Sequence, residues 1–214
     1  MLDGPRLAPL SNSRPNALVV LIHGYGSNGN DLISLAAMIQ PSLRDAAFVA
    51  PNAPSQISGM VAAHQWWPIE TFSMAERAAG AAVAAPGLDA FITEELERAQ
   101  LASDRLLLVG FSQGTMMALH VGLRRPDPVA GVIGISGMLV APERLKLDIH
   151  SRPPVLLIHG TEDDVVPFRS MELASTVLAE VGVSVETHAS PGVRHSVGPD
   201  GLAAATGFAR RVLT

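Results

Sequence analysis

Short apolar runs that end at a glycine or a turn recur along the whole chain. Most of these runs are apolar at nearly every position, which is typical of a strand buried on both faces of a parallel sheet. A half-exposed antiparallel strand would alternate apolar and polar residues instead. The runs that we predict as strands are 17–23, 46–50, 105–109, 130–136, 154–159 and, with a weaker pattern, 183–188.

Helical periodicity fills the segments between the predicted strands. The helices predicted in this way are 30–40, 74–100, 112–124, 168–181 and 199–213. This alternation predicts an α/β fold with a mostly parallel central sheet flanked by helices. Gly80 and the pair Pro86 and Gly87 interrupt the second helical segment, so we expect a break or a kink there.

Length and composition add the domain organisation. The chain has 214 residues, of which 48% are hydrophobic and 16% are charged. A chain of this size buries enough surface to need no disulfide or metal for stability, and nothing inside it resembles a linker. We therefore expect a single domain over 1–214, in which the polar, proline-rich segment 1–16 is peripheral or poorly structured.

Charge and cysteine content exclude several functional classes. Cysteine is absent, which excludes a cysteine nucleophile and a thiolate metal site. The net charge is -5, without a cluster of Lys or Arg, so neither nucleic acid nor a membrane is an expected partner. The first residues lack the apolar core of a secretory signal, and no apolar run reaches the roughly 18 residues of a membrane span. We expect a cytoplasmic protein that binds a small neutral or weakly charged molecule.

The strand predicted at 105–109 leads to the first candidate for chemistry. Ligands of open parallel sheets bind beyond the carboxyl ends of the strands, and this strand runs directly into Gly-Phe-Ser-Gln-Gly and then into a helical segment. A strand, a sharp turn and a helix around G-x-S-x-G form a nucleophile elbow. Glycine is needed twice because side chains there would clash with neighbouring backbone. We therefore predict Ser112 as a nucleophile, and interpret Ser136 in the similar segment GISGM as an ordinary residue at a strand end.

An oxyanion hole is expected beside this serine. Acyl transfer passes through a tetrahedral intermediate, whose oxyanion needs preorganised backbone N–H donors. The N–H of Gln113 directly follows the nucleophile at the start of a helix. A second donor is expected from the loop after an early strand, where His-Gly-Tyr-Gly follows ALVVLI, and the N–H of Tyr25 is our candidate.

The same loop permits a different function. Residues 24–29 read Gly-Tyr-Gly-Ser-Asn-Gly, which satisfies the G-x-G-x-x-G fingerprint of dinucleotide-binding oxidoreductases. That fingerprint also wants an acidic residue at the end of the next strand, about 20 residues on. The strand predicted at 46–50 is followed by Pro51 and Asn52 instead. A dinucleotide-dependent oxidoreductase is therefore only a remote alternative.

The acid and the base of a catalytic triad should come from later strand ends. A serine hydroxyl needs an imidazole to accept its proton and a carboxylate to orient that imidazole, and after such an elbow the acid precedes the histidine in the chain. The loop after VLLIH contains Glu162, Asp163 and Asp164, and the residues alone leave the choice among them open. His195 lies in a Gly- and Pro-rich segment before the last helix, where an exposed catalytic histidine is expected. We interpret the other histidines as structural.

Together these segments resemble the carboxylesterase and acyl-protein thioesterase family, also called phospholipase/carboxylesterase, over nearly the whole chain. The resemblance is carried by LIHGYGSNGNDL, FVAPNAP, QWWPI, GFSQG, IHGTEDDVVP and the RHS near the end. It implies a single-domain α/β-hydrolase fold without a large lid domain, and no metal or organic cofactor. Since many members of this family are dimers, it also implies a possible homodimer.

The resemblance further implies which residues are catalytic. Its pattern His-Gly-x-x-Asp-x-Val-Val-Pro favours Asp163 over Asp164 as the acid, to act with Ser112 and His195. The expected oxyanion donors, the residue after the first His-Gly and the residue after the serine, are again those predicted above. The activity that we expect is hydrolysis of small carboxylic esters with short to medium acyl chains through an acyl-serine intermediate. The alternatives are acyl-protein thioesterase or lysophospholipase activity in the same site, and a hydrolase-like binding module without catalysis.

Two adjacent tryptophans are the last candidates. Trp66 and Trp67 are either core residues or walls of the substrate pocket, since large aromatic side chains serve both purposes. Members of the resembling family often have an acidic residue after a Trp and an aromatic residue, whereas Pro68 follows here. We predict both tryptophans as substrate-binding residues, with this departure leaving their contacts open.

Overall fold

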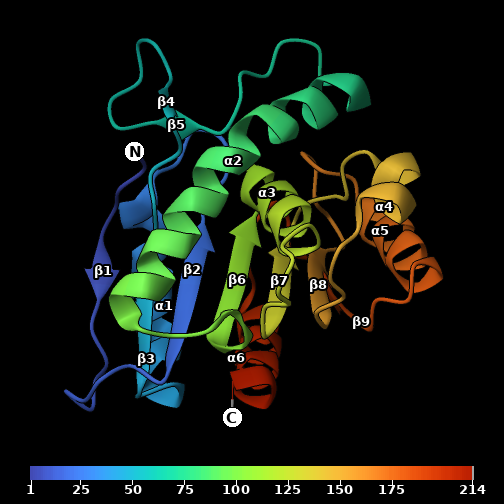
Figure 1. Ribbon diagram of the computed structural model, residues 1–214. Coiled ribbons are helices and arrows are strands. Elements are labelled where there is room, and N and C mark those ends of the chain that lie inside the picture. The colour runs from blue at the N-terminus through green and yellow to red at the C-terminus, as the bar shows by residue number, and fades with distance from the viewer. Residues whose placement is uncertain (214) are drawn as a thin grey trace.

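A seven-stranded sheet forms the centre of the structure, a computed structural model that describes residues 1–213. Its order is β1-β3-β2-β6-β7-β8-β9, and every neighbouring pair is parallel except β1 with β3 (Figure 1). Two short strands outside this sheet, β4 and β5, pair with each other. The strands are β1 Arg6–Leu7, β2 Ala17–Ile22, β3 Ala46–Val49, β4 Ser55–Gln56, β5 His64–Gln65, β6 Leu106–Phe111, β7 Gly131–Ile135, β8 Val155–Gly160 and β9 Val185–Ser190. The mostly parallel sheet predicted from the apolar runs is confirmed.

Helices cover both faces of this sheet. The residues of α2, α3 and α5 share one core cluster with one face, while α1 and α6 pack on the other. The helices are α1 Gly29–Ile39, α2 Met74–Ala99, α3 Gln113–Gly122, α4 Pro142–Asp148, α5 Arg169–Glu180 and α6 Pro199–Leu213, with short 3-10 turns at Gln40–Ser42 and Ser103–Arg105. Side chains of β2 alternate between the two clusters, so the buried strand serves both cores.

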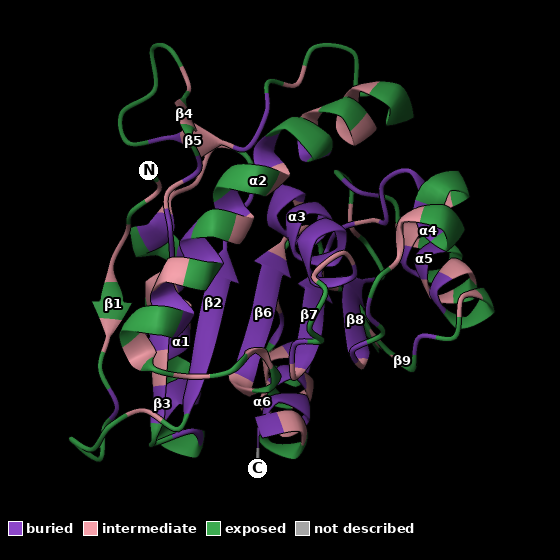
Figure 2. Cartoon of the chain, in the orientation of Figure 1, coloured by how far each residue is buried: buried purple, intermediate pink, exposed green. Residues whose placement is uncertain are grey.

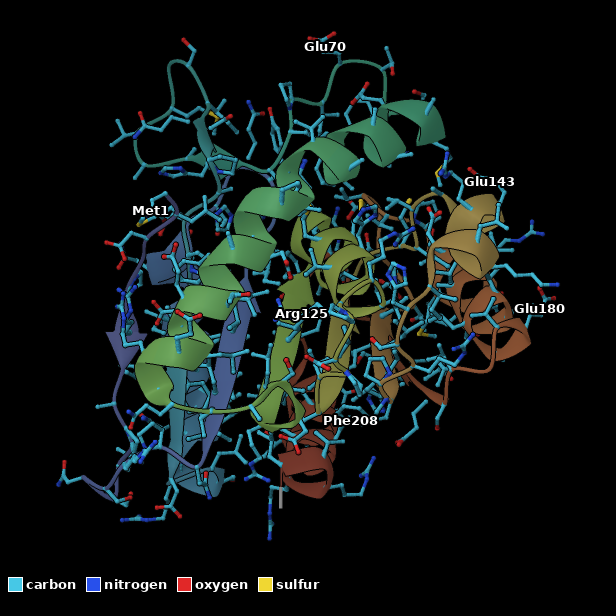
Figure 3. All side chains as sticks on the ribbon, in the orientation of Figure 1. Met1, Glu70, Arg125, Glu143, Glu180 and Phe208 are labelled. Carbon is cyan, nitrogen blue, oxygen red and sulfur yellow. The ribbon has the colours of Figure 1, made fainter. Side chains whose placement is uncertain are left out.

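The strength of each strand signal follows from its place in the sheet. Every residue of β2, β7 and β8 is buried, as Figure 2 shows by colour. The edge strand β9 is mostly exposed or half-buried, and this explains its weaker apolar pattern in the sequence. On the opposite face of the sheet from α2, Phe208 of α6 lies beneath β7 (Figure 3), where a Cβ on Gly131 would be only 2.9 Å from its ring. Close packing therefore explains the glycine in that strand.

The predicted break in the second helix is wrong. α2 runs without interruption from Met74 to Ala99 across Gly80 and Pro86, although its ribbon bends along its length (Figure 1). Proline removes one backbone hydrogen bond and commonly breaks a helix. Here the helix buries Leu88, Phe91 and Ile92 against the sheet, and this packing outweighs the local preference.

The N-terminal segment lies at the outer edge of the sheet and is held there by contacts. β1 pairs antiparallel with β3, Arg6 opposite Val49. The Arg6 guanidinium donates to both carboxylate oxygens of Glu95 on α2, at 3.1 and 2.8 Å, and the Glu95 residue is only 5% exposed. Sequence reasoning missed β1 because two residues carry no periodicity.

None of the helices within residues 1–213 has the length and apolar character needed to cross a membrane.

Candidate active site

The loops after β2, β6, β8 and β9 carry all the residues that were predicted for catalysis. These strands are parallel, so their carboxyl ends lie at one edge of the sheet, the edge below β4 and β5 in Figure 1. The nucleophile elbow follows β6 in the middle of this edge, with the other loops on both sides of it. The fold therefore gathers residues that are far apart in the sequence.

Ser112 occupies a strained turn between β6 and α3. Its φ of 54° and ψ of -116° are unusual for a residue with a side chain. A Cβ on Gly110 would lie 2.3 Å from Gly114 O, and one on Gly114 would lie 1.9 Å from Ile22 O. Both glycines of the elbow are therefore required by backbone that passes within contact distance, as predicted from the sequence.

The predicted triad residues are in mutual contact. His195 Nε2 is 3.0 Å from Ser112 Oγ, and His195 Nδ1 is 2.8 and 3.0 Å from the two carboxylate oxygens of Asp163. Since a carboxylate only accepts hydrogen bonds, Nδ1 carries the hydrogen and Nε2 is free to accept the serine proton. The Asp163 side chain is fully buried, and that of His195 is 18% exposed. This arrangement can perform nucleophilic catalysis with a general base.

The surroundings of Asp163 keep it ionised. Its Oδ1 accepts hydrogen bonds from the N–H groups of Val165 and Val166, at 2.9 and 2.8 Å. Burial alone would raise the pKa of the Asp163 carboxyl, but the hydrogen bonds from His195, Val166 and Val165 outweigh burial and hold the pKa below its ordinary value. A charged carboxylate at neutral pH can orient the imidazole and stabilise its protonated form.

The neighbouring acids point elsewhere. Glu162 is exposed, and the Asp164 carboxylate, half exposed, pairs with the Arg194 guanidinium. Glu162 donates its backbone N–H to Val193 O at 3.0 Å. Of the three acids left open by the residues alone, Asp163 is the one that contacts His195, whereas its neighbours hold the acid loop and the histidine loop together.

The two backbone N–H groups predicted for the oxyanion hole, those of Tyr25 and Gln113, have no hydrogen-bond partner within the described residues. A Cβ on Gly24 would lie 3.1 Å from Ser112 Cβ, so the glycine lets the Tyr25 loop approach the nucleophile. This loop is anchored by Gly26, whose N–H donates to His64 O at 2.9 Å. Free donors beside a nucleophile are the requirement for stabilising an oxyanion.

The geometry of the same loop disfavours the dinucleotide alternative. A pyrophosphate would bind the free N–H groups at the start of α1. These groups are already occupied: the side chain of Asn28 accepts from the N–H groups of Asn30 and Asp31, and Asn52 Oδ1 accepts from Gly29 N–H at 2.8 Å. Within the described residues, no cluster of His, Asp or Glu side chains has the arrangement of a metal site either.

Trp66 and Trp67 are buried residues whose backbone contacts the side chain of Gln113, the residue after the nucleophile. They are 3% and 5% exposed, and the indole N–H of Trp66 donates to His23 O at 2.9 Å. Gln113 holds both: its Oε1 accepts from Trp66 N–H at 2.9 Å and its Nε2 donates to Trp67 O at 3.0 Å. The two rings therefore belong to the core that supports the site. They also line a cavity of about 590 Å³ beside α2, so a role in substrate binding stays a prediction.

The side chain of Gln113 is a contact that sequence reasoning missed. Only its backbone N–H was predicted to act, although the side chain joins the nucleophile elbow to the tryptophan loop, 47 positions away. Nothing in the local pattern indicates this contact, since it depends on two segments meeting in space.

A small apolar cavity was also not predicted. It has a volume of about 240 Å³ and lies between the start of α2, the loop after β7 and α5. A Cβ on Gly137 would be 2.9 Å from Ser112 O, and the next residue, Met138, lines the cavity. The remaining lining residues are Met74, Leu139, Pro142, Ser170, Leu173, Ala174 and Val177. The cavity is therefore lined by the residue that follows Gly137, whose backbone packs against that of Ser112.

Comparison with known proteins identifies relatives of the whole chain. The profile of the family described as Phospholipase/Carboxylesterase matches residues 10–213. An acyl-protein thioesterase 1 from Mycosarcoma maydis is 30% identical over 229 residues, covering 96% of this chain and 95% of that protein. The crystal structure of esterase PE8 is 45% identical, with a TM-score of 0.95 and 99% of each chain covered. An acyl-protein thioesterase 2 from Zea mays, with a TM-score of 0.80 at 22% identity, shares the fold.

Proposed function

The chain belongs to the phospholipase/carboxylesterase family of serine hydrolases, and on this basis we propose that it hydrolyses carboxylic esters with Ser112 as nucleophile, His195 as general base and Asp163 as the orienting acid. The observation that carries the proposal is the 3.0 Å contact between His195 Nε2 and Ser112 Oγ, with Asp163 behind the imidazole at 2.8 Å. Such a relay converts a weakly nucleophilic hydroxyl into one that attacks an ester carbonyl.

Acylation follows from these contacts. Ser112 Oγ attacks the carbonyl carbon while its proton passes to His195 Nε2, and the carbonyl oxygen becomes an oxyanion. The free N–H groups of Tyr25 and Gln113 are our candidates to stabilise that oxyanion. As the tetrahedral intermediate collapses, the C–O bond to the alcohol breaks, and His195 returns its proton to the leaving alkoxide. An acyl-Ser112 ester and a free alcohol result.

Deacylation uses the same groups with water in place of the serine. His195 Nε2 accepts a proton from a water molecule as its oxygen attacks the acyl carbonyl. The proton then passes to Ser112 Oγ when the acyl–serine bond breaks, which releases the carboxylic acid and restores the enzyme. The exposed 18% of the His195 side chain gives water a route to this position.

The apolar cavity beside Met138 supports a preference for short to medium acyl chains. An apolar cavity of about 150 Å³ holds a benzene-sized molecule. On that scale the 240 Å³ found here accommodates an acyl chain of about ten carbons at most. Much longer chains would have to extend onto the surface.

Thioester hydrolysis is the second candidate, because the relatives in Mycosarcoma maydis and Schizosaccharomyces pombe are named acyl-protein thioesterase 1. The same triad chemistry cleaves a C–S bond. A series of p-nitrophenyl esters from C4 to C16, run beside an acyl thioester, separates the candidates. A higher kcat/KM for C16 or for the thioester than for C4 to C8 would contradict the preference.

Covalent labelling tests the central proposal. A fluorophosphonate should label one site per chain of the wild-type protein, and the variant Ser112→Ala should not be labelled or hydrolyse p-nitrophenyl butyrate. Ser136→Ala serves as a control, because Ser136 is buried and its Oγ donates to Ser196 O. Labelling that survives in Ser112→Ala would show that the nucleophile is misassigned, and absence of labelling in the wild type would favour a binding module without catalysis.

A further inference from the structure

A second histidine lies against Asp163, at the same carboxylate oxygen, Oδ2, that His195 contacts. His159 is 1% exposed and stands near the end of β8. Its Nε2 is 2.9 Å from Val166 O and 3.2 Å from Asp163 Oδ2. Both neighbouring atoms are acceptors, so Nε2 must carry a hydrogen. This N–H donates to the Val166 carbonyl, and it also lies close to the Asp163 carboxylate, which its partial positive charge attracts.

The backbone of Val166 is hydrogen-bonded to both this histidine and the acid. Its carbonyl accepts from His159 Nε2, and its N–H donates to Asp163 Oδ1 at 2.8 Å. The two ends of one short backbone segment are therefore fixed by a side chain of β8 and by the catalytic acid. The ring of Phe168 meets the imidazole of His159 edge-on, with ring centroids 6.0 Å apart. These contacts leave the imidazole one orientation.

Asp163 consequently depends on donors that His159 keeps in place. The acid accepts from His195, from Val165 N–H and from Val166 N–H. If the His159 imidazole were removed, the Val166 carbonyl would be buried without a partner and its peptide would be free to turn. An acid displaced in this way no longer aligns His195 with Ser112, and displacements of about 1 Å can cost about 100-fold in rate.

We propose that His159 is a positioning residue of the catalytic site, which acts through Val166 and Asp163 to orient His195. The proposal rests on the function proposed above. Among the histidines of residues 1–213, His159 is the one besides His195 whose ring contacts the Asp163 carboxylate.

Other buried histidines offer a contrast. His23 hydrogen-bonds to Gly24 O through Nδ1 and accepts from Ala53 N–H through Nε2, so it supports the oxyanion loop. His120 lies in α3, and its Nδ1 has no hydrogen-bond partner in the described chain. His120→Phe is therefore a matched control: a buried histidine is replaced by the same residue, without a link to Asp163.

The principal test compares His159→Phe with His159→Gln. Phenylalanine fills the volume without a donor, whereas the amide nitrogen of glutamine can take the place of Nε2. We expect His159→Phe to lower kcat by about 10- to 100-fold with KM changed less than about twofold, and to slow fluorophosphonate labelling by the same factor. His159→Gln should recover most of the loss, and His120→Phe should match the wild type. A folded His159→Phe with wild-type kcat, or a folded His159→Gln that is no better than His159→Phe, would overturn the proposal.

If His159→Phe does not fold, a measurement on the wild-type protein still tests the proposal. Nitrogen-15 NMR of the histidine rings distinguishes the two neutral tautomers. The proposal requires the Nε2–H tautomer at His159, and an Nδ1–H tautomer would refute it. Labelling of the wild type distinguishes the two hypotheses. If the wild-type protein is not labelled, the proposed enzymatic function is rejected. If it is labelled but the His159 variants have wild-type kcat, only the positioning role of His159 is rejected.

Discussion

Gly80 of α2 lies directly against the indole ring of Trp67. A Cβ at Gly80 would be 2.2 Å from Trp67 Cγ, and the Trp67 residue is only 5% exposed. The glycine that costs helix stability in isolation is thus the residue that lets a tryptophan pack on the helix. The tryptophan loop is in turn joined to the nucleophile elbow through Gln113, so this contact supports the site.

The substitution Gly80→Ala tests that contact. The added methyl group must displace the ring of Trp67, and we expect a loss of about 1–3 kcal/mol in the free energy of unfolding, as for other overpacked sites. Gly87→Ala in the same helix is the control, because a Cβ there meets nothing within 4 Å. It should stabilise the protein by about 0.5–1 kcal/mol. Urea unfolding followed by tryptophan fluorescence measures both, and equal effects would contradict the packing argument.

Adjacent acids should differ sharply in their effect on turnover. Asp163→Asn leaves His195 without an ionised partner, and we expect kcat to fall by about four orders of magnitude. Asp164→Asn breaks only the exposed pair with Arg194, whose contribution to stability is small, so kcat should stay within about twofold. Initial rates with p-nitrophenyl butyrate decide the matter. Similar losses in the two variants, or the reverse order, would mean that the acid is assigned to the wrong residue.

Chain-length selectivity should respond to Leu173. This residue of α5 lines the apolar cavity and is 57% exposed, so a larger side chain fits without disturbing the core. Leu173→Trp should lower kcat/KM for C8 esters by about tenfold while C4 esters change little, because losing the burial of even one methylene group in an apolar pocket costs about 1–3 kcal/mol. Leu147→Trp, at an exposed position of α4 outside the cavity, is the matched control. A parallel loss for C4 and C8 would argue that the acyl chain lies elsewhere.

Acid sensitivity of the fold should depend in part on His120. Burial, followed by the charge of Arg124, lowers the pKa of His120 from 6.5 to about 4, against a small opposing effect of Asp148. Between these pH values the unfolded chain binds a proton that the folded chain does not. The stability contributed by neutral His120 is therefore lost as the pH falls from 6.5 to 4, by at most about 3 kcal/mol.

The variant His120→Phe removes this proton linkage. Unfolding in urea at pH 7, 5.5 and 4.5 should show the wild type losing more stability on acidification than the variant. The difference between the two proteins is the relevant quantity, because other groups titrate in both. Parallel stability curves would indicate that His120 is protonated in the folded protein as readily as in the unfolded one.

The sequence predicts well those features that depend on nearby residues. Continuous apolar runs revealed the buried strands, and Gly110 and Gly114 around Ser112 indicated the strained turn. The edge strand β9 gave a weaker signal because most of its residues are exposed or half-buried. The break predicted in α2 is wrong, since packing against the sheet is not visible in the local preference of Pro86.

Features that depend on distant segments were harder to predict. The choice among Glu162, Asp163 and Asp164 required a family resemblance, because composition does not determine which carboxylate turns inward. Nothing in the local sequence indicates the contact of Gln113 with the tryptophan loop, and His159 was interpreted only as a structural histidine. In each case the deciding information is the direction of a side chain in three dimensions.

The two edges of the sheet are protected against aggregation in different ways. β1 covers the outer side of β3 with paired backbone, while β9 displays polar side chains, among them Glu186 in an ion pair with Arg211. Unpaired strand edges recruit other chains. Removing the first seven residues would therefore uncover the edge of β3, whose own four residues carry no charge, and we expect the shortened protein to self-associate even with its catalytic residues unchanged.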